Sequence, residues 1–327
     1  MLARAHAPAQ DSMAPAAQPA GPVAAGRGNG FRADRVKAMV QGGSGEQIAI
    51  TPDLAAMISG NEVSGPDVPV TEEEKGKGYS DTQFKGTPFV KGAGDTNDID
   101  ANDAVQGSLA NCYFIAAMEA VARANPEAIR KLIKDNGNGT YDVTLYISGG
   151  GWSWKAAPKV FTVDDYFPGK SSTNPAYAKT GDSGEKGPEL WAMLLEKAYA
   201  KSKGSYKDIA WGNTGAAMEL LTGQGAQTIT PASYSDEKLA EAIDKAIAEK
   251  RPVACATKDL EKESEEVRKL APSNVVGKHA YAPISVDKDK KTITLQNPWG
   301  ASYQVNDLPL ASFKKLYHSV YIGAAAQ

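Results

Sequence analysis

The sequence has few of the residues from which disulfide and metal frameworks are built. Its 327 residues include two cysteines, Cys112 and Cys255, so one disulfide could form but a network of bridges could not. Two cysteines and three histidines (His6, His279 and His318) cannot supply a repeated zinc-ligand pattern either. Each Cys and His can therefore be considered singly as a candidate for chemistry.

Long apolar runs and strong net charge are also missing. No stretch reaches the length of a membrane span, and the net charge of −3 argues weakly against a nucleic-acid partner. Gln, Asp and Pro interrupt the N-terminus where a secretion signal needs a continuous apolar core. We therefore expect no membrane span, no nucleic-acid binding, no standard signal peptide and, by default, a cytoplasmic location. The oligomeric state stays open.

The first part of the chain carries weak structural signals. Residues 1–30 are rich in Ala, Pro and Gly and have too little bulky apolar surface to offset the entropy lost on ordering. Helices over 31–40 and 52–58 are conceivable, and the charged stretch 71–78 is typical of a solvated linker. We expect a disordered tail over 1–80, with removal as a pro-segment as a further hypothesis.

The remainder alternates between helical and strand patterns and predicts an α+β fold. The helices are predicted from apolar spacing and end signals, and the strands from alternation. The predicted helices are 112–124 after the N-cap Asn111, 188–203 from Pro188 to Gly204, and 235–251 capped by Ser235. The predicted strands are 141–147, 159–168, 252–257, 280–286, 291–296 and 317–323.

Cys112 is the first candidate for chemistry. It stands at the predicted start of a helix, and a helix N-terminus is one environment that favours the thiolate, which is the nucleophile. Attack of a thiolate on a carbonyl creates an oxyanion, which needs hydrogen-bond donors. The backbone N–H of Cys112 and the side-chain amide of Gln106, on the preceding loop, are suitable donors.

A histidine and an asparagine are predicted to meet in a hairpin. If the chain turns tightly around Asp287–Asp289, His279 and Asn297 lie opposite each other at the ends of two strands. The Asn amide could then orient the imidazole, and the nearby Trp299 could shield the hydrogen bond from water.

Each of these residues has a structural explanation when it is taken alone. A cysteine on an apolar helix is more often a packing residue, and Asn297 before Pro298 is typical of a turn. Their joint pattern with Gln106 and His279 is harder to explain in this way. Cys255 lies in an apolar strand and is expected to belong to the core.

Five stretches resemble the protease core of calpains, in the order of that family. They are DAVQGSLANCYFIAA, FTVDDYFP, PELWAMLLEKAYAKSKGSY, GKHAYAPISVD and LQNPWG, and they lie between about residues 85 and 300. The resemblance implies a papain-like, two-lobed cysteine protease core. A helical lobe would span 81–213 and a β-rich lobe 214–327.

The resemblance also implies roles for individual residues. Cys112 would be the nucleophile, His279 the base, Asn297 its orienting partner and Gln106 an oxyanion donor. Substrate would contact Gly212 and Trp299, where Gly212 lets the substrate backbone approach closely. Calpains have Gly directly before the catalytic His, whereas this chain has Lys278, with Gly277 one place earlier.

Calcium is the only cofactor that the resemblance implies. Asp103 and Glu196 match acidic ligand positions of the helical lobe, and carboxylate oxygens suit Ca²⁺. The expected function is a cysteine endopeptidase that acts on proteins or peptides through an acyl-enzyme, with activation by calcium and no organic cofactor. The alternatives are a catalytically silent scaffold with the calpain fold and a host-directed toxin or acyl transferase that uses the same Cys–His pair.

Overall fold

The structure is a computed structural model that describes residues 66–93, 95–148 and 156–325. All of them belong to one compact unit, Pro66–Gln327. The helices expected over 31–40 and 52–58 lie outside the described residues, as does most of the expected tail. Within that tail, the stretch expected to be a linker instead forms a short helix. There Thr71 and Glu74 make a capping box that satisfies the free N–H groups of the first turn.

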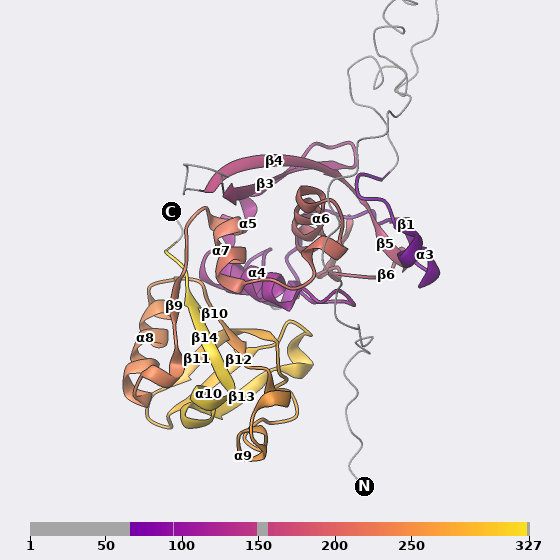
Figure 1. The fold of residues 1–327 in the computed structure, drawn as a ribbon. Coiled ribbons are helices and arrows are strands. Elements are labelled where there is room, and N and C mark those ends of the chain that lie inside the picture. The colour runs from indigo at the N-terminus through magenta and orange to yellow at the C-terminus, as the bar shows by residue number, and fades with distance from the viewer. Residues whose placement is uncertain (1–65, 94, 149–155, 326–327) are drawn as a thin grey trace, which may run out of the picture. The chain divides into compact units, whose positions relative to one another are not determined.

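The described chain mixes helices with antiparallel sheets (Figure 1). The helices are α3 (Glu72–Gly76), α4 (Cys112–Ala124), α5 (Pro126–Arg130), α6 (Trp191–Lys203), α7 (Thr214–Thr222), α8 (Asp236–Ala248), α9 (Glu265–Arg268) and α10 (Leu310–Leu316). The strands of the largest sheet are β9 (Gln227–Ile229), β10 (Val253–Thr257), β11 (Ala280–Asp287), β12 (Thr292–Gln296), β13 (Val305–Pro309) and β14 (Tyr317–Ile322). The other strands are β1 (Ser80–Gln83), β2 (Ile133–Asp135), β3 (Thr140–Ser148), β4 (Ala156–Asp164), β5 (Tyr166–Ser171), β6 (Asn174–Pro175), β7 (Ser183–Gly184) and β8 (Gly187–Pro188).

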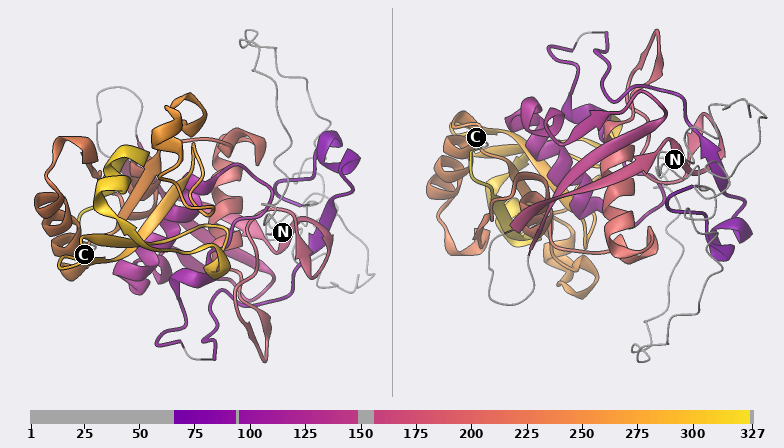
Figure 2. Two further views of the ribbon diagram at one scale, coloured as in Figure 1. Left: turned by 90° about the horizontal axis from the view of Figure 1, so that it is seen from below. Right: turned by 90° about the horizontal axis from the view of Figure 1, so that it is seen from above.

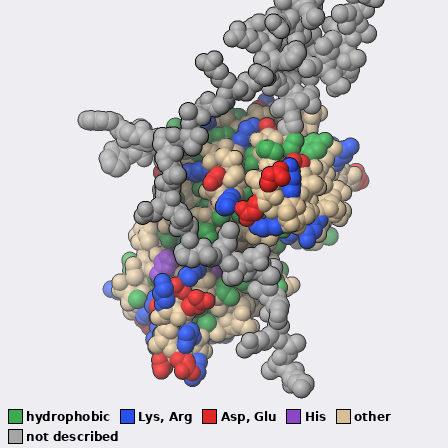
Figure 3. Space-filling model, turned by 45° about the vertical axis from the view of Figure 1, so that its right-hand side comes forward, with side chains coloured by type: hydrophobic (Ala, Val, Ile, Leu, Met, Phe, Trp, Pro, Cys, Tyr) green, Lys and Arg blue, Asp and Glu red, His purple; other side chains and the backbone are tan. Residues whose placement is uncertain are grey.

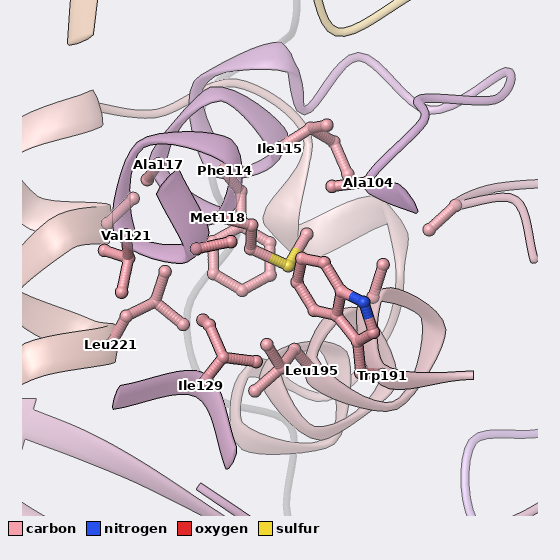
Figure 4. Close-up of a cluster of buried hydrophobic side chains, with 14 of the residues drawn as sticks. Ala104, Phe114, Ile115, Ala117, Met118, Val121, Ile129, Trp191, Leu195 and Leu221 are labelled. Carbon is pink, nitrogen blue, oxygen red and sulfur yellow. The ribbon is translucent and has the colours of Figure 1, made fainter. Parts of the chain in front are cut away.

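One large hydrophobic cluster is centred on α4. In Figure 4 the side chains of Phe114, Met118 and Val121 of α4 face those of α6 and α7, which are labelled Trp191, Leu195 and Leu221. The hairpin of β3 and β4 packs over α6 and α7 (Figure 1). Because α7 packs in this cluster, the predicted boundary after residue 213 does not coincide with the packing: Thr214–Thr222 was assigned to the β-rich part.

A second hydrophobic cluster lies on the other side of the largest sheet. The sheet runs in the order β13-β12-β11-β10-β14-β9, and α8 and α10 pack on it with Leu239, Ile243 and Phe313 (Figure 2). The face toward this cluster carries bulky side chains such as Tyr281, and Cys255 is buried there, so the expectation of a core role for Cys255 is confirmed.

On the opposite face of the same sheet, the buried side chains of β10 and β11 are small. Ala254, Ala280 and Ala282 alternate with the bulky residues and belong to the cluster around α4. Side chains this small let a helix approach a sheet closely, and α4 packs directly on β10 and β11. This packing brings the start of α4 next to the start of β11.

The surface carries both signs of charge. On the face in Figure 3, Lys and Arg side chains lie among Asp and Glu, and neither sign forms a continuous field. Of the helices in the described part of the chain, none has the length and apolar character that crossing a bilayer requires.

Candidate active site

Cys112 is the first residue of α4, as its position after Asn111 predicted. The role predicted for Asn111 is only half right: it is the N-cap residue, but its side chain makes no capping hydrogen bond. Its Nδ2 instead donates to Oε1 of the buried Glu196 at 2.6 Å. The residue before Cys112 is therefore hydrogen-bonded to α6, which fixes the start of α4.

The Cys112 thiol lies beside the backbone of β11. Burial raises the pKa of the Cys112 thiol, and the backbone N–H groups of Ala280, Tyr113 and Cys112 itself oppose that rise. Burial outweighs the helix N-terminus, so the thiol is protonated at neutral pH, in contrast to the expectation of a lowered pKa. The Ala280 N–H belongs to the residue that follows His279.

His279 and Asn297 meet as predicted. Nε2 of the imidazole lies 2.9 Å from Oδ1 of Asn297, and both side chains are almost fully buried. Burial lowers the pKa of His279 to about 4, against the opposing effect of the Asn297 hydrogen bond. The ring is therefore neutral at pH 7.

The register by which they meet differs from the prediction. In the β11–β12 ladder, Ala282 faces Gln296, and a bulge follows Pro283. Continuing this register would place His279 opposite Trp299, because the turn lies later in the chain than expected, at residues 288–291. His279 lies one residue before β11 and reaches Asn297 diagonally, which the spacing of neighbouring strands allows.

Several contacts hold this pair in place. The His279 N–H donates to Oγ1 of Thr257 at 2.9 Å, and the Trp299 N–H donates to Oδ1 of Asn297 at 3.0 Å. Nδ2 of Asn297 donates to the carbonyl of Asn274 at 3.4 Å. The rings of His279 and Trp299 lie 4.7 Å apart between centroids, so the indole covers one side of the imidazole.

Gln106 lies on a loop that joins the two halves of this site. Its backbone N–H donates to the carbonyl of Pro298 at 2.8 Å, directly after Asn297. Its side-chain Nε2 donates to the Leu109 carbonyl at 2.6 Å, which leaves the second amide hydrogen free to bind another acceptor. The Oε1 atom is buried without a partner.

Gly212 and Lys278, the two positions compared above with glycines of calpains, have different backbone constraints. At Gly212 a Cβ would lie 2.4 Å from Cζ of Tyr113, which is too close. The ring of Tyr113, the residue after Cys112, therefore requires glycine at position 212. Lys278, where calpains have Gly, adopts a φ of 55°, a conformation that glycine adopts at less cost.

The two predicted calcium ligands do not come together. Glu196 accepts hydrogen bonds from Asn111 and, at 2.9 Å, from the Ala178 N–H, and burial raises its pKa to about 7. Asp103 instead groups with Asp95 and Asp182, whose carboxylate oxygens lie within 4.8 Å of one another.

Glu189 is the acidic residue that the sequence interpretation missed near Asp103. Burial and the adjacent Asp103 raise its pKa to about 10, and its Oε2 is buried without a hydrogen-bond partner. The motif PELW, which contains Glu189, lies within the quoted resemblance and was the available signal. The three grouped aspartates, with the unpartnered Oε2 of Glu189 near Asp103, are a suitable ligand set for a hard divalent cation.

Comparison with known proteins agrees with this geometry. The family model described as "Calpain family cysteine protease" matches residues 92–306. The chain belongs to this family. The match covers Gln106, Cys112, His279 and Asn297, so the calpain resemblance is confirmed and a cysteine peptidase is the activity class of the family.

Calpain relatives are similar over about two thirds of the chain. A calpain-type cysteine protease of Zea mays is 28% identical over 219 residues, covering 64% of this chain and 9% of that protein. Calpain-13 of Rattus norvegicus is 29% identical over 204 residues, and Calpain-8 of Homo sapiens is 27% identical over 224 residues. The match covers 61% and 65% of this chain and 29% of each relative. The chain thus spans less than a third of the length of these calpains.

Proposed function

We propose that this chain is a cysteine endopeptidase that hydrolyses peptide bonds through Cys112, His279 and Asn297. The observation that carries the proposal is the buried hydrogen bond between His279 and Asn297, with the next residue, Ala280, at the Cys112 thiol. The proposal includes a two-lobed, papain-like arrangement. It is supported by the two hydrophobic clusters. One contains Cys112, and the other lies on the opposite face of the sheet whose strand β11 follows His279.

The protonation states define the first chemical step. The thiol carries its proton and the imidazole is neutral, so His279 acts as a general base. Because Nε2 is bound to Asn297, Nδ1 is the nitrogen that accepts the proton as sulfur attacks the peptide carbonyl. The imidazolium then returns this proton to the leaving amine as the C–N bond breaks. Water, deprotonated by the same ring, hydrolyses the thioester and restores the thiol.

The oxyanion formed in these steps needs donors. The backbone N–H at the first position of α4 has no acceptor within the helix, and the Gln106 amide has one hydrogen beyond its bond to Leu109. Trp299 covers the His279 ring and would exclude water, and Gly212 would let the substrate backbone approach.

The test uses the full-length protein with casein and a fluorogenic peptide. Cleavage should be present in the wild type and lost in Cys112→Ala and His279→Ala, whereas Cys255→Ala should retain it because Cys255 is a core residue. Iodoacetamide should label Cys112 and not Cys255, as judged by peptide mass mapping. A wild type without Cys112-dependent cleavage, with calcium or with chelator, would favour the silent scaffold.

Calcium binding is the second part of the proposal. Asp95, Asp103 and Asp182 would hold the ion together with the adjacent Glu189, so Asp103 is kept from the pair expected from sequence and Glu196 is not. When bound, the ion would neutralise these carboxylates. Asp103 lies three residues before Gln106, so the ion would fix the loop that carries the oxyanion donor.

Thermal unfolding with and without calcium tests this site. An ion that binds only the folded state at a hundred times its Kd adds about 2.7 kcal/mol of stability. Glu189→Gln should lose most of this gain, whereas Glu196→Gln should keep it although its own stability falls. Binding should also release protons, because the pKa of Glu189 is about 10 and that of Asp103 about 6. A wild-type melting temperature that calcium does not raise would contradict the calcium proposal.

A further inference from the structure

Trp211 is an exposed aromatic residue beside the proposed nucleophile. Its exposed fraction is 61%, the largest among the bulky hydrophobic residues of the described part of the chain, ahead of Val160 at 57% and Tyr166 at 38%. An indole combines a large apolar surface with one polar N–H group, and for this reason tryptophan is enriched at binding interfaces.

The backbone of Trp211 is held in a strained conformation. Its φ is 63°, in the left-handed region that glycine adopts readily and that is a rare outlier for a bulky residue. Glycine would relieve the strain, yet the chain carries its largest side chain here. Outliers of this kind gather at functional sites, where the surrounding structure enforces them.

Two contacts fix Trp211 next to the start of α4. Its N–H donates to the carbonyl of Ala110 at 2.8 Å, two residues before Cys112. The following residue, Gly212, packs against the ring of Tyr113, the residue after Cys112. The backbone at Trp211 and Gly212 thus contacts Ala110 before the nucleophile and Tyr113 after it, while the Trp211 side chain faces solvent.

We propose that Trp211 determines specificity by binding an apolar, preferably aromatic, side chain of the substrate near the scissile bond. The inference rests on the proposed peptidase function. An apolar partner is favoured over a charged one because residues 209–215, IAWGNTG, carry no charge, and an exposed indole pairs best with another ring.

The experiment compares peptides that carry Phe or Ser at each position around the scissile bond. At one position the wild type should prefer Phe, and Trp211→Gly should reduce this kcat/KM ratio by about ten-fold, the scale of an apolar contact. Trp211→Phe should keep most of the preference. Tyr166→Ala, which removes another exposed aromatic side chain, is the matched control and should leave the ratio unchanged. A ratio that is the same in the wild type and Trp211→Gly overturns the inference.

A binding measurement separates this inference from the proposed function. Fluorescence anisotropy of the same labelled peptides is recorded with Cys112→Ala and with Cys112→Ala combined with Trp211→Gly. If cleavage is absent but the affinity ratio falls when Trp211 is replaced, the peptidase proposal fails and the peptide contact of Trp211 stands. If neither cleavage nor the affinity ratio depends on Trp211, the inference is wrong.

Discussion

Acidification should destabilise this protein through His279. The imidazole is buried, and its pKa falls from 6.5 to about 4 on folding. Between these two values the unfolded chain binds a proton that the folded chain does not, so the free energy of unfolding decreases as the pH falls. The difference between the two pKa values corresponds to about 3 kcal/mol, lost as the pH decreases from 6.5 toward 4.

The measurement needs a reference variant because Glu196 acts in the opposite direction. Its pKa rises from 4.5 to about 7 on folding, so it favours the folded state as the pH falls through this range. The two effects partly cancel in the wild type. His279→Gln removes only the histidine contribution, and its amide can still donate to Asn297.

Urea unfolding of both proteins at several pH values from 7.5 to 4.5 gives the difference directly. We expect the wild type to lose about 2 to 3 kcal/mol more than His279→Gln between the ends of this range. A second variant, His279→Asn, checks that the result does not depend on the new side chain. Equal pH dependence in all three proteins would show that His279 is not held neutral by burial and would refute the base assignment.

Two further predictions concern backbone conformation and are measured by urea unfolding. Lys278→Gly should raise the free energy of unfolding by about 0.5 to 1 kcal/mol, because glycine adopts the φ of 55° without steric cost; an unchanged or lower stability would contradict this. Gly212→Ala should lower it by about 1 to 3 kcal/mol, because the new methyl group would lie 2.4 Å from the ring of Tyr113. Gly225→Ala, where a Cβ meets nothing within 4 Å, is the matched control and should show a much smaller loss.

Helix positions were predictable where short-range signals mark their ends. Cys112 begins α4 and Ser235 caps α8, and both were predicted correctly because a cap and a stop act within one helical turn. Helix α6 ends before Gly204 as expected but begins at Trp191. The predicted start, Pro188, lies in β8 because it pairs with a neighbouring strand, which apolar spacing does not reveal.

The family and the identity of the proposed catalytic residues could be predicted without coordinates. The spacing of Gln106 and Cys112 before an apolar helix, and the LQNPWG motif after a strand, are local patterns, and both lie within residues 92–306, the range that the family model matches. The diagonal reach from His279 to Asn297 could not be predicted, because a bulge and a turn that lies later in the chain shift the register of the hairpin.

Sequence by itself therefore determined which residues are available for chemistry and which helix presents Cys112. Tertiary structure alone decided which carboxylates gather, since Glu189 and Glu196 stand seven residues apart near the start of the same helix and are equally acidic in sequence. In the folded chain Glu196 accepts a hydrogen bond from Asn111, whereas Glu189 lies beside Asp103. The physical reason is that ligand sets and pKa values depend on burial and on neighbours distant in the chain, neither of which local spacing encodes.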